Sequence, residues 1–225
     1  MKRFLSVWML VVGLLVAGGA NAITFNNYTT SNGLGDNTVF GVFASGNTVY
    51  AATSGGLSIS TDGGTSFTNK TTANGLGDNT VFGVFASGST VYAATLVGLS
   101  ISTDGGTSFT NKTTADGLGD NIVYGVFASG STVYAATFGG LSISTDGGIS
   151  FTNYTTADGL GNNDNRGVFA SGSEVYAATF GGLGIYSPPP TPPQPIPTLS
   201  EWAQIMMMLA MIATAGFYGW RMKQR

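Results

Sequence analysis

The sequence contains no cysteine and no histidine. These two absences exclude a disulfide framework, a Cys/His zinc site, a cysteine nucleophile and an imidazole general base. Only 8% of the residues are charged, and between positions 23 and 187 three basic residues stand against ten acidic ones. Because phosphate binding needs clustered Lys and Arg, a nucleic-acid partner is not expected. Oxygen-rich loops could attract calcium, but they lack EF-hand or nonapeptide spacing, so no metal and no cofactor is predicted.

Glycine is abundant, with 35 residues in 225, and it gathers with Ser, Thr and Asn between short runs of Val, Phe, Tyr and Ala. This alternation indicates an all-β fold. The stretch at 60–67 recurs at 102–109 and 144–151, a period of 42 residues, with Ile149 replacing a threonine in the third copy. A period of this length predicts one supersecondary unit per repeat, stacked on its neighbours.

Each copy places Asp-Gly-Gly between two β-rich runs, which predicts a hairpin turn closed by the aspartate carboxylate. The pattern resembles the Asp-box, or BNR, repeat of sialidase-like β-propellers. The resemblance implies a structural turn between the third and fourth strands of a blade, and no catalytic role. The residues that carry the motif are Ser60, Asp62, Gly64, Phe67, Ser102, Asp104, Gly106, Phe109, Ser144, Asp146, Gly148 and Phe151.

One period reads as four strands, which in the second repeat are expected at 79–87, 89–95, 98–103 and 107–113. The first two runs are almost wholly apolar and the fourth is polar, a gradient that suits a propeller blade with its polar strand outermost. Complete units are expected at 38–72, 80–114 and 122–156. A fourth begins at Asp164 and ends near Ser187 without its fourth strand.

The missing strand has a counterpart at the start of the chain, because residues 25–30 align with residues 151–156. We therefore predict a four-bladed β-propeller closed by the N-terminal strand, which would leave no exposed sheet edge. Two alternatives stay open at this point. The units could form an open solenoid, although the polar capping repeats expected at its ends are not visible in the sequence. Alternatively, two chains could share one larger ring by exchanging the fourth strand.

Catalysis is not expected. The sialidases of the Asp-box family use an arginine triad and a tyrosine–glutamate pair, whereas Arg166 is the one arginine between positions 23 and 187. The acidic residues are copies in equivalent turns, so paired carboxylates in different environments are not predicted. A sialidase-like glycan-active enzyme and a purely structural surface protein are the alternative interpretations.

The loops between repeats recur at 32–37, 74–79, 116–121 and 158–163, and we expect them to line one face with the turns between the second and third strands. In one interpretation their Asp and Asn residues only close their own turns. In the other they form a ligand face for sugar or peptide. In the fourth repeat Asp164-Asn165-Arg166 replaces Thr80-Val81-Phe82, which is either drift or a unique polar patch. The candidate ligand-face residues are Asp36, Asp78, Asp120, Phe138, Phe180 and Arg166.

The two ends of the chain predict export. Residues 1–22 have the basic start, apolar run and small-residue cleavage site of a secretory signal peptide, although a retained anchor is the alternative. The propeller is expected at 23–187, followed by a Pro-rich linker at 188–195. An uncharged stretch at 203–220 predicts a transmembrane helix, and the basic residues after it stay on the cytoplasmic side.

Residues 196–225 closely resemble the IPTL-CTERM sorting signal of Gram-negative bacteria, in which a short motif precedes the apolar span and basic end. The resemblance implies recognition by an exosortase-type membrane enzyme, with a plain C-terminal anchor as the alternative. The matching residues are Ile196, Pro197, Thr198, Leu199, Glu201 and Trp202. The sequence thus predicts an inner-membrane precursor that is sorted to the cell surface or matrix as a non-catalytic binding or display module.

Overall fold

The computed structural model describes residues 24–188, 204 and 206–208. The chain divides into two compact units, Met1–Tyr186 and Ser187–Arg225. The first unit, over its described residues, is all-β. The signal peptide predicted at 1–22, and most of the linker, sorting motif and span predicted at 188–225, lie outside the described residues.

The described β-strands form antiparallel sheets in which strands that follow one another in sequence are neighbours. The first sheet contains β1 (Val39–Ser45), β2 (Thr48–Thr53), β3 (Gly56–Ser60) and β4 (Thr68–Lys70). The second contains β5 (Val81–Ser87), β6 (Thr90–Thr95), β7 (Gly98–Ser102) and β8 (Thr110–Lys112). The third contains β9 (Val123–Ser129), β10 (Thr132–Thr137), β11 (Gly140–Ser144) and β12 (Thr152–Tyr154). The fourth contains β13 (Asn165–Ser171), β14 (Glu174–Thr179) and β15 (Gly182–Tyr186).

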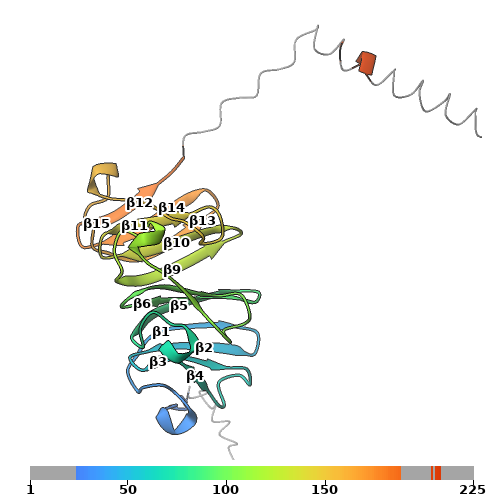
Figure 1. Ribbon diagram of the computed structural model, residues 1–225, viewed down its shortest axis with the longest axis vertical. Helices are drawn as coiled ribbons and strands as arrows, with labels where there is room; N and C mark the ends of the chain where they lie inside the picture. The colour runs from blue at the N-terminus through green and yellow to red at the C-terminus, as the bar shows by residue number, and fades with distance from the viewer. Residues whose placement is uncertain (1–23, 189–203, 205, 209–225) are drawn as a thin grey trace, which may run out of the picture. The chain divides into compact units, whose positions relative to one another are not determined.

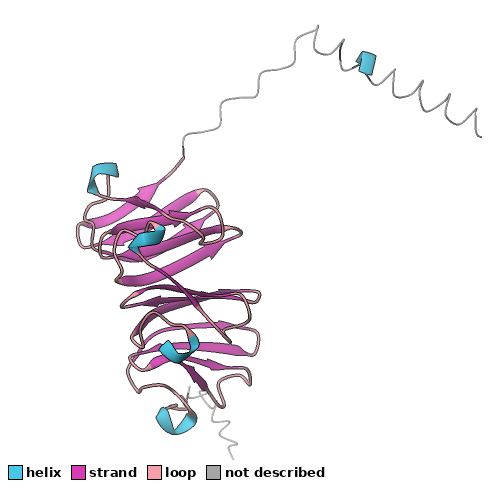
Figure 2. Ribbon diagram, in the orientation of Figure 1, coloured by secondary structure: helices cyan, strands magenta, loops and turns pink. Residues whose placement is uncertain are grey.

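The sheets stack face to face, and Figure 2 shows them as successive layers of strands. The hydrophobic core lies between the layers. Between the first and second sheets, Leu57 and Ile59 of β3 pack with Val81 and Val91 of the next sheet. The same positions, shifted by one repeat each time, form the next two clusters. The four propeller-like blades expected from the 42-residue period are present, and the last one has three strands among the described residues.

The first strands of successive sheets approach closely because each carries a glycine near its start. A β-carbon on Gly41 would lie 3.0 Å from the carbonyl oxygen of Phe82 in the next sheet, and one on Gly83 would lie 3.0 Å from that of Tyr124. Real side chains rarely tolerate such a contact, so glycine permits this spacing. The inner strands β1, β5, β9 and β13 therefore pack next to one another in order.

Short 3-10 helices open the loops between sheets: η1 (Thr30–Asn32), η2 (Thr72–Asn74), η3 (Thr114–Asp116) and η4 (Thr156–Asp158). In η3 the backbone N–H of Thr113 donates to Asp116 Oδ2 at 2.9 Å, and Ala115 N–H donates to the Thr113 hydroxyl at 3.3 Å. These 3-10 helices were not predicted from the sequence, which indicated only loops between the repeats. The capping pattern, Thr followed three residues later by Asn or Asp, is the sequence signal for them.

The predicted closure of the ring by the N-terminal strand is wrong. Residues 24–29 form no strand, Phe25 is 93% exposed, and the outer edge of β15 has no partner among the described strands. The segment stays beside the first sheet, where the Tyr28 ring contacts Phe67 and Thr29 N–H donates to Asn32. The fourth sheet lies at the other end of the stack (Figure 1), out of reach of a segment held in this way.

In the second unit, residues 204 and 206–208 are helical. Among the residues that the structure describes, no helix combines the length and the apolar character needed to span a membrane. The helix predicted at 203–220 lies largely outside those residues.

Candidate ligand face at the loop edge of the sheets

The Asp-box aspartates close their own turns. Asp104 Oδ1 accepts the Ser102 hydroxyl at 2.7 Å and the Ser108 N–H at 3.0 Å, while its Oδ2 accepts the Ser108 hydroxyl at 2.6 Å. The hydrogen bond from Ser102, followed by those from Ser108, holds the pKa of this carboxyl far below its usual range. Asp62 and Asp146 have the same arrangement and the same direction of shift. These carboxylates stay ionised and are engaged within the turn.

The buried hydroxyl of the box serine is the centre of each turn. Ser102 is almost fully buried, and besides donating to Asp104 it accepts the Gly106 N–H at 2.8 Å. Gly106 has a φ of 87°, a left-handed conformation that favours glycine. Ser, Asp and Gly are therefore needed at this spacing for geometric reasons.

The loop aspartates are also engaged by their own backbone. Asp36, Asp78 and Asp120 each accept, at 2.7 Å, the N–H two residues further on. In the fourth repeat Asn162 takes this position and accepts the Asp164 N–H at 2.8 Å. The pKa of the Asp36 carboxyl is lowered, first by the Thr38 N–H and then by the Ser54 hydroxyl. These residues fix the loops, one in each repeat, rather than converging on a single point.

The loops and the turns between the second and third strands meet at one edge of every sheet. Phe138 N–H donates to the carbonyl oxygen of Ile122 at 3.0 Å, and Phe180 N–H donates to that of Asp164 at 3.2 Å. Equivalent bonds tie Ser54 to Thr38 and Leu96 to Thr80 in the first two sheets. The exposed rings of Phe138 and Phe180 are thus placed at the same edge as the loops.

A continuous row of planar side chains runs along this edge. We call it the aromatic row, and its members are Phe40, Phe82, Tyr124, Arg166 and Phe180. The centroids of Phe40 and Phe82 are 5.5 Å apart, and those of Phe82 and Tyr124 are 5.4 Å apart. The Arg166 guanidinium lies 3.8 Å from the Tyr124 centroid and 4.8 Å from that of Phe180. Such stacking of a cation on aromatic rings is favourable.

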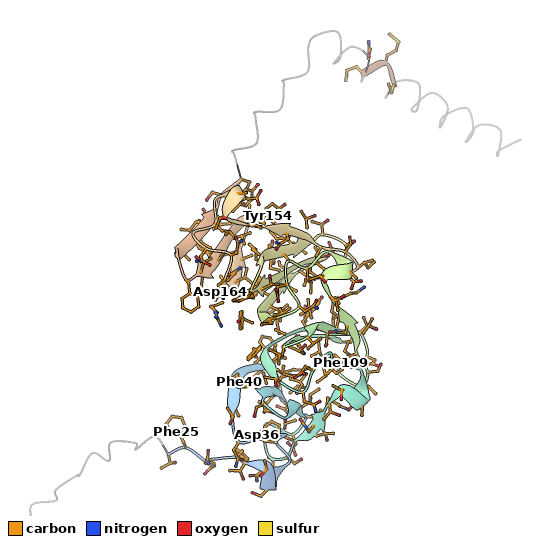
Figure 3. The ribbon with its side chains drawn as sticks, turned by 60° about the vertical axis from the view of Figure 1, so that its left-hand side comes forward. Phe25, Asp36, Phe40, Phe109, Tyr154 and Asp164 are labelled. Atoms are coloured by element: carbon orange, nitrogen blue, oxygen red, sulfur yellow. The ribbon has the colours of Figure 1, made fainter. Side chains whose placement is uncertain are left out.

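The guanidinium of Arg166 is held in place by Asp164. Arg166 Nη2 donates to Asp164 Oδ2 at 2.7 Å, and Nε lies 2.7 Å from Oδ1. The contact between Nε and Oδ1 is an ion pair and not a hydrogen bond, since Asp164 Oδ1 has no hydrogen-bond partner in the described structure. Figure 3 shows Phe40 and Asp164 on the same side of the stack, and Phe109 on the other side in that view.

Beside this pair lies an unusual buried amide. Asn165 is fully buried where the first three sheets carry valine, and neither its Oδ1 nor its Nδ2 has a hydrogen-bond partner in the described structure. An unpaired buried polar group costs stability, and such a residue calls for an explanation. The fourth sheet thus differs from the others in three consecutive residues at the loop edge.

The structure brings together two of the six candidate ligand-face residues, Arg166 and Phe180. It places Phe138 at the same edge and the three aspartates inside their own turns. Sequence reasoning missed Phe40, Phe82 and Tyr124, which had been assigned only to apolar strands. The available signal was the 42-residue spacing, which aligns these positions with Arg166. Within the described residues, no group of three acidic side chains could hold a metal ion.

Residues 194–222 match the IPTL-CTERM motif. No curated protein sequence matches the chain.

Solved structures show the fold. The extracellular domain of a hybrid two-component system from B. thetaiotaomicron aligns with a TM-score of 0.63 and 19% identity, over 73% of this chain and 24% of that one. An ancestral GH74 enzyme aligns with a TM-score of 0.51 and 24% identity, over 64% and 22%. YCF48 from Cyanidioschyzon merolae aligns with a TM-score of 0.51 and 15% identity, over 67% and 53%. The chain thus spans only a quarter to about half of these proteins.

Proposed function

We propose that this chain is an exported, surface-sorted and non-catalytic binding module, and that its aromatic row binds carbohydrate. The observation that carries the proposal is the row itself. Five planar side chains from four sheets lie side by side at one exposed edge, with centroid separations of 5.5 and 5.4 Å between its aromatic rings. Exposed aromatic rings supply a rigid surface that is apolar in the middle and polar at its rim.

The charge at the row suits a neutral ligand. The guanidinium of Arg166 is already paired with the Asp164 carboxylate, so the pair leaves no net charge beside the rings. Its remaining N–H groups can donate to hydroxyl or carbonyl oxygens of a bound molecule. A saccharide offers both an apolar ring face and such oxygens. Absence of catalysis is supported by the engagement of the repeated carboxylates within their own turns.

A peptide is the second candidate ligand. One of the solved structures with this fold is YCF48 bound to the D1 peptide, which aligns with a TM-score of 0.51 over 68% of this chain. Aromatic side chains and arginine are also enriched where proteins bind one another.

Export and sorting follow from the tail. The IPTL-CTERM match at 194–222 implies processing by an exosortase-type system. We propose that the first unit is thereby displayed outside the inner membrane. Changing Pro197 and Thr198 to Ala should block processing, and mass spectrometry of the C-terminus in fractionated cells measures it. If wild-type cells hold only chains that end at Arg225, the tail is a plain anchor.

The binding proposal is tested with immobilised polysaccharides and peptides and the Arg166→Ala variant. We expect the affinity for a bound glycan to fall about tenfold or more, because the row loses the cation that links Tyr124 and Phe180. Lys70→Ala is the matched control, since it removes one positive charge from β4 and should leave binding unchanged. Equal affinity of wild type and Arg166→Ala for every captured ligand would place the binding surface elsewhere.

A further inference from the structure

The two ends of the stack expose the two halves of an interface that the chain already makes three times. We call the side of each sheet that packs on the next sheet its forward face, and the opposite side its back face. On the first sheet the forward face includes Phe43, Tyr50, Leu57 and Ile59. The equivalent residues of the fourth sheet, three 42-residue repeats later in the sequence, are Phe169, Tyr176, Leu183 and Ile185.

These four residues are the same on both sheets, although Glu174 replaces a threonine at the start of β14. The main difference is what covers them. Leu57 and Leu99 are fully buried on their forward faces, whereas Leu183 is 64% exposed. At the other end Val42, on the back face of the first sheet, is 73% exposed, although its equivalents Val84 and Val126 pack into the interfaces. Each exposed face therefore has a complementary partner surface, and both are present in one chain.

A cavity of about 490 Å³ lies between the third and fourth sheets. It is lined by Tyr134, Leu141, Ile143, Leu160, Val175 and Ala177, among others. The equivalents of these six residues surround Phe109 between the first and second sheets. Phe151 has the same position between the second and third sheets. The fourth repeat has no Asp box, and its sheet contains three strands among the described residues, so the place of this phenylalanine is a cavity.

The segment that would fill the cavity is also exposed. Residues 25–30 repeat the sequence of 151–156 apart from one residue, and Phe25 stands where the third repeat has Phe151. Inside the chain, the strand just before each inter-sheet loop is the last strand of the sheet that the loop leaves. For example, β12 pairs with β11 of the third sheet, and the chain then continues through η4 to β13 of the fourth. Residues 25–29 precede η1 and β1 in the same way, but none of the described sheets precedes the first one.

We propose that two copies of this chain associate head to tail, each packing the back face of its first sheet on the forward face of the other's fourth sheet. Residues 25–29 of one copy then form the fourth strand beside β15 of the other, and Phe25 enters the cavity. The pairing of β11 with β12 sets the register, which matches Leu183 with Tyr28 and Ile185 with Asn26. This association is independent of the binding proposed for the aromatic row.

The count of sheets favours two copies. Contacts of this kind form a ring where the rotation closes and a filament where it does not. Two copies supply eight sheets, six of them complete within one chain and two completed by residues 25–29 of the other copy. Eight is within the range of roughly four to eight blades found in propellers. A third copy would exceed that range.

The absence of cysteine makes the test direct. The full chain carrying Tyr28→Cys and Leu183→Cys is expressed, oxidised and run on a non-reducing gel. Paired strand residues have Cα atoms about 4.5–5.5 Å apart, which a disulfide can bridge. We expect a covalent dimer that reduction dissolves, with peptides containing positions 28 and 183 joined between isotopically different copies. A monomer with an internal disulfide, free thiols, or a ladder beyond the dimer would overturn the proposal.

Two controls separate assembly from damage. Tyr28→Cys with Ser87→Cys, which places the second thiol at the exposed end of β5 in the second sheet, should give no dimer. Phe25→Ala should weaken the association about a hundredfold, as followed by sedimentation velocity on dilution. Because Phe25 is exposed in the single chain, this change should not unfold it. Unaltered association of folded Phe25→Ala would show that the cavity is not filled by this residue.

Discussion

The second and fourth repeats share most of the residues of their first three strands, yet their neighbours in the structure differ. The second sheet is covered on both faces, and its forward-face residue Leu99 is fully buried. Among the described residues the fourth has a neighbouring sheet on one face, and Leu183 at the equivalent position is exposed. Burial in this molecule is therefore set by the neighbouring sheet and not by the residue, as expected for repeats whose stability comes largely from their interfaces.

The residues that differ from the repeat pattern are concentrated in the fourth repeat. Asn165, Arg166 and Glu174 replace apolar or neutral residues in the fourth repeat, and the Asp box is absent there. The first three sheets thus maintain the stack, and the fourth carries the residues that differ. The following changes test this contrast, beginning with the largest expected effect.

Removing the phenylalanine of a complete repeat should have the largest effect. Phe109→Ala leaves a void between the first and second sheets, and we expect it to lower the free energy of unfolding by about 3–5 kcal/mol. Phe25→Ala, measured in dilute solution, should change it by less than about 0.5 kcal/mol because that side chain is exposed. Urea unfolding of both variants measures the difference. Equal losses of unfolding free energy in the two variants would mean that Phe25 is as buried in the single chain as Phe109.

Correcting the buried amide should stabilise the fourth repeat. Asn165→Val restores the residue of the other three repeats and removes an unpaired buried group, and we expect a gain of about 1–3 kcal/mol. Val81→Asn, the reverse change in the second repeat, should cost a similar amount. Thermal unfolding followed by circular dichroism measures both. A loss of stability in Asn165→Val would show that the amide has a partner that the structure does not contain.

The Asp-box turn should depend on its buried hydroxyl. Ser102→Ala leaves the Gly106 N–H without its acceptor, and we expect a loss of about 1–2 kcal/mol in urea unfolding. Thr103→Ala is a control at a neighbouring exposed position and should have little effect. If the two variants unfold alike, the hydroxyl is not the centre of the turn.

A change of pH near neutrality should have the smallest effect on the free energy of unfolding. The pKa values of Asp62, Asp104 and Asp146 are lowered in the fold, so the unfolded chain binds protons first as the pH falls. The stability they contribute is present above about pH 4 and is lost below it. We expect the urea midpoint to be flat from about pH 7 to pH 5 and to decline below about pH 4. A decline beginning near pH 6 would point to a different group.

The sequence predicted what depends on local patterns. The 42-residue period, the strand order within a repeat and the direction of the polarity gradient follow from residues that are close in sequence. The strand pairing of Tyr92 with Ile101, for example, needs only the two-residue alternation and the intervening turn.

Whether the sheets close into a ring within one chain could not be predicted from the sequence, because closure depends on the rotation from one sheet to the next. Residues 25–30 carry the correct strand sequence, but the sequence does not state which sheet they will reach. The stacking of Arg166 between Tyr124 and Phe180 is a similar case, since residues 42 and 14 positions away meet only when the sheets pack.

The Asp-box turns have a further consequence, which concerns ionic strength. Their carboxylates are held by hydroxyl and N–H donors rather than by cations. Within the part of the chain that the structure describes, the ion pairs are Lys112–Asp116 and Arg166–Asp164, each between residues close in sequence. Salt screens the attraction between exposed charges, whereas these turns depend on short hydrogen bonds from neutral donors. The stack can therefore keep its stability across fresh and saline surroundings.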